Sequence, residues 1–241
     1  MKIFKPKFWE KINLISIFLY PASLILQLLI ATKKIFISQN SFKIPIICIG
    51  NIYLGGTGKT PLSILITREL IKKKKKPAII KKFYKAHIDE HKLINNSLNC
   101  LFLNNTRLKS IKAAERKHYN VAILDDGFQD ISIKKDLNIL CFNSNQLIGN
   151  GLTIPAGPLR ESMSAIKKAQ IIVINGNKDK LFEKRILTVS EKIKIFYSRY
   201  LPTNINQFKK KKILAFAGIG NPNNFFNLLR DNNLNVQKKV A

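Results

Sequence analysis

A short glycine-rich run constrains this chain more strongly than any other part of its sequence. It follows the apolar stretch 44–49, precedes a helix-like segment, and consists of Gly55, Gly56, Thr57, Gly58, Lys59 and Thr60. Glycines allow backbone N–H groups to turn toward a polyphosphate, and the N-terminus of a helix adds partial positive charge. In this arrangement the Lys59 ammonium reaches the β- and γ-phosphates, and the Thr60 hydroxyl ligates Mg²⁺. The order of strand, loop and helix therefore predicts a P-loop that binds a nucleoside triphosphate.

The run departs from the commonest P-loop pattern at its first glycine. That pattern places a glycine at position 53, where this chain has Tyr53. The doublet Gly55-Gly56 instead resembles the G-G-x-G-K-T variant, and the position before the doublet, a lysine in some ATPases with that variant, is Leu54. The alternative is an ordinary glycine-rich turn, and the flanking strand and helix argue against it.

Short apolar runs alternate with helix-like segments along most of the chain. Strands are expected at 77–80, 100–103, 121–124, 137–142, 171–174 and 213–217, with an edge strand at 192–200. Helices are expected at 61–71, 108–116, 162–169 and 223–230. This alternation predicts an α/β fold in which a mostly parallel sheet carries helices on both faces. We expect three parts, which are an N-terminal segment at 1–40, a P-loop core at 41–210 and the start of a further domain at 211–241.

The N-terminal segment contains a long uncharged stretch. No charged residue occurs from Ile12 to Thr32, a length that would suffice to cross a bilayer. Pro21 lies near its middle, where proline would kink or divide a helix. We expect a membrane-associated pair of helices lying in the membrane interface, with Phe8-Trp9 as an interfacial anchor. A true membrane span and a packed core helix are the alternatives.

The chain is strongly basic, with 42 Lys and Arg residues against 14 Asp and Glu residues and a formal net charge of +28. Such charge favours an anionic membrane surface or a polyanion as partner, or reflects a general bias in residue usage. Neither zinc-ligand spacing nor aromatic interleaving accompanies the lysine runs, so the sequence disfavours a module that reads nucleic-acid sequence.

Three cysteines, Cys48, Cys100 and Cys141, each lie in an apolar, strand-like run. Their spacing matches no metal motif, and an odd number argues against a disulfide framework. We expect buried thiols.

A second constellation follows the strand-like run 121–124, which ends in Asp125 and Asp126. A buried strand that places an aspartate beside the P-loop is the Walker-B arrangement, which holds Mg²⁺ against the phosphates. Ligands of open α/β sheets bind at the carboxyl ends of the strands, where both aspartates are expected. A turn-capping pair is the alternative.

Glycine and proline are dense in the segment 149–158, which predicts an irregular loop that leads into Arg160 and Glu161. An arginine in such a loop can bind phosphate through two parallel hydrogen bonds. The alternative is an Arg–Glu pair that only caps the following helix.

Three motifs in this order resemble the tetraacyldisaccharide 4'-kinase family, the lipid A kinases of Gram-negative bacteria. They are Gly50-Asn51 with the glycine run through Pro61, the segment 125–129 and the segment 155–161, and the likeness extends from the N-terminal apolar stretch to the last residues. The resemblance implies a P-loop NTPase-type kinase that uses ATP and Mg²⁺. Its expected substrate is a lipid A disaccharide 1-phosphate, which receives the γ-phosphate on its 4'-hydroxyl.

The resemblance also implies a location and partners. Family members are peripheral enzymes on the cytoplasmic face of the bacterial inner membrane, so we expect contact with that anionic surface. We expect a monomer, and no specific nucleic-acid partner.

Individual roles follow from the same resemblance. Gly55 to Thr60 bind the nucleotide, with Lys59 at the phosphates, and Thr60 and Asp125 hold Mg²⁺. The family's active-site motifs contain Asp126, Gln129, Arg160 and Glu161. Asp89-Glu90 looks like the family's Gly-Asp-Glu motif, in which the aspartate is the proposed base for the sugar hydroxyl.

Several positions depart from the family pattern. His87-Ile88 precede Asp89 without the motif's glycine, Lys81-Lys82-Phe83-Tyr84 replaces Ser-Arg-Gly-Tyr, and Asp130 stands where a histidine is usual. The sequence ends at Ala241, shortly after 218–222, so we expect a truncated C-terminal domain. The family's histidine proposed to pair with the catalytic aspartate has no match among His87, His91 and His118.

The leading hypothesis is therefore an ATP-dependent lipid kinase. The alternatives are a catalytically impaired ATP-binding remnant, a membrane-associated P-loop ATPase without an acceptor, and a polyanion-binding protein.

Overall fold

The computed structural model describes residues 5–85, 88–202, 204–218 and 222–240. The chain divides into two compact units, Met1–Tyr197 and Ser198–Ala241. The boundaries expected at 40/41 and 210/211 stay proposals. Of the family motifs, His87 and residues 219–221 lie outside the described ranges.

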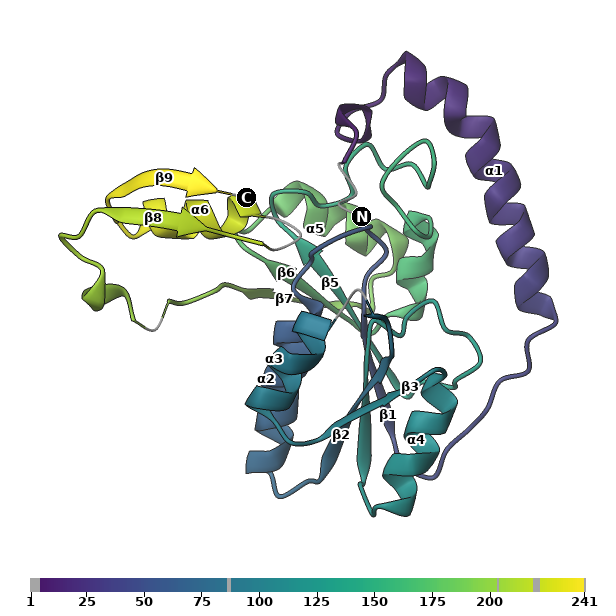
Figure 1. Ribbon diagram of the computed structural model, residues 1–241. Coiled ribbons are helices and arrows are strands. Elements are labelled where there is room, and N and C mark those ends of the chain that lie inside the picture. Colours follow the sequence, from purple (N-terminus) through teal and green to yellow (C-terminus); the bar gives the residue numbers. More distant parts are fainter. Residues whose placement is uncertain (1–4, 86–87, 203, 219–221, 241) are drawn as a thin grey trace. The chain divides into compact units, whose positions relative to one another are not determined.

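The first unit is built on a seven-stranded sheet with the order β3-β2-β4-β1-β5-β6-β7 (Figure 1). The strands are β1 (Ile46–Gly50), β2 (Pro77–Lys82), β3 (Leu101–Asn104), β4 (Val121–Asp125), β5 (Leu137–Asn143), β6 (Ile171–Asn175) and β7 (Lys194–Ser198). The neighbouring pairs from β3 to β6 are all parallel, and β7 forms the expected edge strand. The predicted α/β class is confirmed.

Helices cover both faces of this sheet because successive strand residues point to opposite sides. On β4, Ile123 packs with α2 (Lys59–Lys72), and α3 (Ile88–Ser97) lies against α2. Ala122 and Leu124 point to the other face, which is covered by α4 (Arg107–Arg116), the 3₁₀ helix η3 (Met163–Lys168) and α5 (Lys180–Val189). The three cysteines are free and buried, as expected, and burial raises the pKa of Cys48 and of Cys141 to about 12.

The segment 162–169 is helical, as expected, and forms the short 3₁₀ helix η3. The run 213–217 contains a strand, as expected: β8 (Ile213–Phe216) pairs in parallel with β9 (Val236–Val240) in a two-stranded sheet separate from the large one. In this second unit, α6 (Pro222–Asp231) connects the two strands, and the short 3₁₀ helix η4 (Ile205–Gln207) precedes them.

The N-terminal stretch forms one continuous helix, α1 (Leu14–Ile35), which follows the 3₁₀ helix η1 (Lys7–Trp9). The expected helical pair is therefore wrong. Asn13 and Ser16 form a capping box that starts the helix, and Pro21, which cannot donate a backbone hydrogen bond, lies inside it without dividing it. Trp9 is buried, so it is not an exposed interfacial anchor.

One side of α1 is docked on the first unit through polar side chains. The Ser23 hydroxyl donates to the Thr153 carbonyl at 2.9 Å and accepts from the Ala156 N–H at 3.0 Å. The Gln27 amide donates to the Thr153 hydroxyl at 2.6 Å. These contacts hold α1 on the glycine- and proline-rich loop that leads to Arg160.

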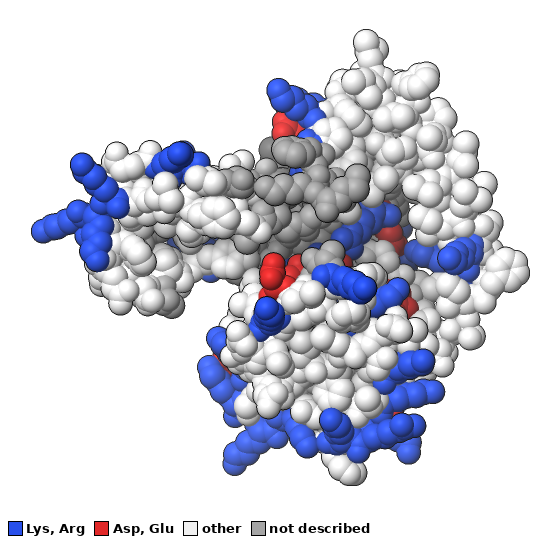
Figure 2. All heavy atoms as spheres, viewed as in Figure 1, with Lys and Arg blue, Asp and Glu red and all other residues white. Residues whose placement is uncertain are grey.

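The other side of α1 exposes large apolar residues, among them Leu14, Phe18 and Leu28. Figure 2 shows the visible surface of this helix as almost uncharged, whereas many Lys and Arg side chains gather at the lower end of the first unit. Among the described residues, α1 is the one helix long and apolar enough to cross a membrane.

Gly50 ends β1 in close contact with the backbone of Phe128. A Cβ at this position would collide with Cβ of Phe128, whereas a Cβ on Gly56 would meet nothing within 4 Å. We expect Gly50→Ala to lower the free energy of unfolding by about 1–3 kcal/mol through overpacking, measured by urea denaturation. Gly56→Ala is the control, and equal stability of the two variants would contradict this account of the packing.

Candidate functional site

The glycine run forms a loop between β1 and α2. Gly55 has a φ of 126° and Gly58, which caps α2, has a φ of 89°, and both values favour glycine over other residues. The fully buried Asn51 holds the loop, because its amide donates to the Gly55 carbonyl at 3.2 Å and to the Thr57 hydroxyl at 3.0 Å. Asn51 had no predicted role of its own, although its position directly after β1 was a signal.

Asp125 is fully buried at the carboxyl end of β4, beside this loop. Its carboxylate accepts hydrogen bonds from the Thr60 hydroxyl at 2.9 Å and from the Ser63 hydroxyl at 3.3 Å. Both donors lie in the first turns of α2. The expected proximity of Thr60 and Asp125 is therefore present in the structure.

Lys81 is a buried member of the site that was noted in the sequence only as a departure from the family pattern, with no predicted role. Its ammonium lies 2.6 Å from Asp125 Oδ2 and 2.6 Å from Glu90 Oε2. Burial alone would lower the pKa of Lys81, but the Asp125 and Glu90 carboxylates outweigh burial and raise it. The signal was the position of Lys81 near the end of β2, which pairs with β4 in a register that matches Ile80 with Leu124.

The Lys81–Glu90 ion pair connects the buried carboxylate to the first turn of α3. Asp89 precedes Glu90 in that turn and is exposed. Asp89, the predicted base, therefore precedes Glu90, whose carboxylate is connected through Lys81 to Asp125, the predicted Mg²⁺ ligand.

A second set of charges surrounds Asp126. Its carboxylate lies 3.6 Å from the Lys59 ammonium and 3.1 Å from Arg160 Nη1. Burial alone would raise the pKa of Asp126, but Lys59 and Arg160 outweigh burial and lower it. Asp126 has a φ of 58°, and Arg107 fixes this turn by donating to the Asp126 carbonyl at 2.6 Å.

Arg160 also connects this set to the P-loop. Arg160 Nη1 donates to Gln129 Oε1 at 3.4 Å, and the Gln129 amide donates to the Asn51 carbonyl at 2.8 Å. The backbone N–H of Arg160 donates to the Ile52 carbonyl at 2.7 Å. The three motifs of the sequence therefore meet at one edge of the sheet.

Glu161 takes a different position from its neighbour Arg160. Its carboxylate lies 3.3 Å from the ammonium of Lys34 on α1 and 3.6 Å from that of Lys168 on η3. Glu161 thus connects the site loop to the N-terminal helix, and its predicted catalytic role stays a prediction.

The residues at this edge fit a magnesium ion bound with a nucleotide. The Thr60 hydroxyl and the Asp125 carboxylate are oxygen donors on adjacent elements, and Mg²⁺ in such sites takes one or two protein oxygens together with phosphates and water. The described residues contain no group of three or more His, Cys, Asp and Glu side chains that could hold a metal by themselves.

The pairing of Asp125 with Lys81 predicts a specific effect on stability. Asp125→Asn leaves a buried ammonium whose remaining carboxylate partner, Glu90, is 46% exposed, so we expect a loss of about 3–5 kcal/mol in urea denaturation without nucleotide. Adding Lys81→Met should recover part of this loss, because it removes the uncompensated charge.

Glu69→Gln is the control, since it removes an exposed ion pair with Lys72 and should change stability by less than about 1 kcal/mol. An Asp125→Asn variant as stable as this control would contradict the pairing.

Comparison with known proteins assigns the chain to a family. Residues 15–241 match the family model of LpxK, described as tetraacyldisaccharide-1-P 4'-kinase. A tetraacyldisaccharide 4'-kinase of Pelagibacter ubique is 43% identical over 98% of this chain and 76% of its own length. The enzyme of Francisella tularensis subsp. novicida is 31% identical over 97% of this chain and 83% of its own length.

A solved structure supports the fold. LpxK from Aquifex aeolicus, crystallised in complex with ATP, superimposes with a TM-score of 0.71 at 22% identity and covers 94% of this chain and 81% of that one. The matches in sequence, which span nearly the whole chain, place it in the tetraacyldisaccharide 4'-kinase family.

Proposed function

We propose that this chain transfers the γ-phosphate of ATP to the 4'-hydroxyl of a tetraacyldisaccharide 1-phosphate, a step of lipid A biosynthesis. The observation that carries this proposal is the meeting of Lys59, Asp125, Asp126 and Arg160 at the carboxyl edge of the sheet, in a chain of this family. Phosphoryl transfer depends mainly on positioning and on neutralising charge, and this edge offers both.

Lys59 and Arg160, the two cations paired with Asp126, have complementary tasks in the proposal. Lys59 lies at the N-terminus of α2, where it binds the terminal phosphates together with the backbone N–H groups of the loop. Arg160 stabilises the charge that develops on the transferred phosphoryl group. Asp126 holds both cations before the nucleotide arrives. When Mg²⁺ is bound, Thr60 and Asp125 hold it, and it neutralises charge on the phosphate oxygens.

Asp89 is proposed to orient the acceptor hydroxyl and to take its proton. Its exposure on α3 leaves the carboxylate accessible to a sugar. The Lys81 ammonium lies 2.6 Å from the Glu90 carboxylate and 2.6 Å from the Asp125 carboxylate. These two ion pairs hold the turn that carries Asp89 in place relative to Asp125. A base of this kind contributes mainly in the transition state, when the hydroxyl becomes acidic.

The proposed location is the cytoplasmic face of the inner membrane, with α1 lying on the lipid as a peripheral anchor. The exposed apolar side of α1 supports this, because its opposite side is already occupied by hydrogen bonds to Thr153 and Ala156. Such a helix lies with its apolar side at the acyl boundary, and the lysines of the chain add attraction to anionic headgroups.

An ATPase without an acceptor is the second candidate, and the same phosphate site would serve it. The two functions differ in whether ATP turnover requires the lipid. A remnant that binds ATP without turning it over is the third candidate.

The kinase proposal predicts that Asp89 matters for chemistry more than for nucleotide binding. Asp89→Ala should lower kcat by roughly 10²–10⁴ with little change in KM for ATP. The measurement is transfer of labelled γ-phosphate to a tetraacyldisaccharide 1-phosphate in detergent micelles. Lys92→Ala, an exposed change on the same helix, is the control. Undiminished transfer by the Asp89→Ala variant would rule out its role as base.

The location proposal predicts that membrane binding depends on the exposed side of α1. Replacing Leu14, Phe18 and Leu28 together by serine removes three large side chains that are each at least 65% exposed. Since burial of each contributes about 1.5–3 kcal/mol, partitioning to anionic vesicles should fall by more than about 100-fold.

Leu65→Ser on α2, where the leucine is 52% exposed, is the control and should leave sedimentation with vesicles unchanged. Sedimentation of the triple variant like the unchanged chain, at high salt, would place the anchor elsewhere.

A further inference from the structure

Lys5 carries a buried ammonium that the proposed mechanism does not use. Its Nζ atom is buried, and among the described residues it has neither a hydrogen-bond partner nor a carboxylate that forms an ion pair with it. It contacts the face of the Tyr53 ring, whose centroid lies 4.7 Å away, and the carboxylates of Glu10 and Asp179 line the same cavity as Lys5 without forming an ion pair with it. Burial lowers the pKa of Lys5. Burying an ammonium costs free energy unless an anion or a hydrogen-bond acceptor compensates its charge. We therefore expect this group to bind an anion or an acceptor.

The ammonium lies against the glycine doublet of the P-loop. A Cβ built on Gly55 would lie 3.3 Å from Lys5 Cε and 3.4 Å from Lys5 Nζ. Tyr53, which the ammonium also contacts, occupies the position where the commonest P-loop pattern has its first glycine. Lys5 therefore meets the phosphate loop at its start, whereas Lys59 meets it at its end.

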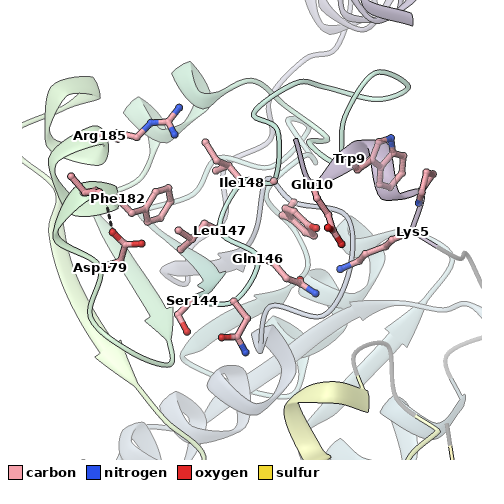
Figure 3. Close-up of a pocket in the computed structure, with 15 residues that line it drawn as sticks. Lys5, Trp9, Glu10, Ser144, Gln146, Leu147, Ile148, Asp179, Phe182 and Arg185 are labelled. Carbon is pink, nitrogen blue, oxygen red and sulfur yellow. Dashed lines mark hydrogen bonds between the residues drawn. The ribbon is translucent and has the colours of Figure 1, made fainter. Parts of the chain in front are cut away.

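An open cavity of about 430 Å³ lies beside this contact (Figure 3). Its walls come from the N-terminal segment with Lys5, from the segment after β5 and from the start of α5 with Asp179 and Phe182. In Figure 3 the Lys5 side chain extends into this space from the side opposite α5. Gln146 Oε1, in the same wall, is also buried and has no hydrogen-bond partner in the described part of the chain. Ligands of open α/β sheets bind outside the carboxyl ends of the strands, where this cavity lies.

The position of Lys5 is fixed by the fold, because η1 is anchored on the site loop. The Trp9 indole donates to the Pro155 carbonyl at 3.1 Å, and the Asn150 N–H donates to the Trp9 carbonyl at 2.8 Å. The Asn150 amide donates to the Phe8 carbonyl at 3.1 Å. These bonds hold the segment that carries Lys5 against the loop that ends in Arg160.

We propose that Lys5 is a second phosphate-binding lysine, which donates to the polyphosphate of the nucleotide held by residues 55–60. Lys59 is already paired with Asp126, whereas the Lys5 ammonium, beside the glycine doublet, has no anionic partner among the described residues. The N-terminal segment then completes the nucleotide site, and the same segment leads into the membrane-facing helix α1. This inference rests on the proposed function, since it assumes that the loop binds a nucleoside triphosphate.

The test compares the affinity of the full chain for ATP and for inorganic triphosphate by calorimetry. Lys5→Met keeps the length of the side chain and removes its charge, and it should raise Kd for both probes about 10- to 100-fold, as for the loss of a charge-assisted phosphate contact. Lys7→Met is the matched control, an exposed lysine of the same segment, and should change Kd less than twofold.

The emission of Trp9, the single tryptophan of the chain, shows whether η1 remains seated in each variant. An Lys5→Met variant with unchanged emission that binds both probes within twofold of the unchanged chain would overturn the inference. If Lys5→Met shifts the emission, Lys5→Arg decides, because it keeps the charge. If the Lys5→Arg variant binds both probes within about fivefold of the unchanged chain, the inference is supported. If it loses as much affinity as the Lys5→Met variant, the inference is overturned.

Failure of the proposed function has a different result. An unchanged chain that does not bind ATP, or a Lys59→Ala variant that binds it equally well, would contradict the nucleotide site itself. If Lys59→Ala weakens ATP binding and Lys5→Met leaves it unchanged, the role of Lys5 is contradicted and the nucleotide site is not.

Discussion

The whole site depends on the burial of one carboxylate, that of Asp125. A fully buried carboxylate needs hydrogen bonds and an opposite charge, and here both come from different elements. The hydroxyls of Thr60 and Ser63 connect it to the helix that follows the P-loop, and Lys81 connects it to β2 and, through Glu90, to α3. The need to compensate this single charge therefore fixes the nucleotide loop, the central strands and the turn of the proposed base relative to one another.

A second consequence is a physical connection between α1, whose outer side is apolar and exposed, and the predicted phosphate site. The loop that contacts Ser23 and Gln27 of α1 continues into Arg160, which contacts Asp126. Lys34 of α1 also pairs with Glu161, the residue after Arg160. For an enzyme whose acceptor is a lipid, this arrangement would hold the phosphate-binding side chains at a fixed position relative to the surface from which the substrate comes.

The sequence predicts those parts of the structure that depend on local patterns. The apolar runs give the strands of the large sheet, and the glycine run between a strand and a helix gives the P-loop. The helix α3 was missed because its residues are mostly polar, and the helical pair was expected because Pro21 is a strong local signal. The roles of Lys81 and Lys5 depend on contacts across 44 and about 50 residues of chain, so no local pattern indicates them. Sheet order, which brings β2 beside β4, is the missing information.

Transfer of phosphate from ATP to a lipid acceptor at this edge of the sheet can be tested by the ratio of phosphorylated lipid to ADP formed in turnover. The purified chain is supplied with ATP, Mg²⁺ and a tetraacyldisaccharide 1-phosphate in micelles, and ADP and phosphorylated lipid are measured together. For a kinase we expect one new phosphate on the 4'-hydroxyl for each ADP formed, and little ADP without the lipid. ADP and inorganic phosphate formed at the same rate with or without the lipid would exclude a kinase that transfers phosphate to this lipid.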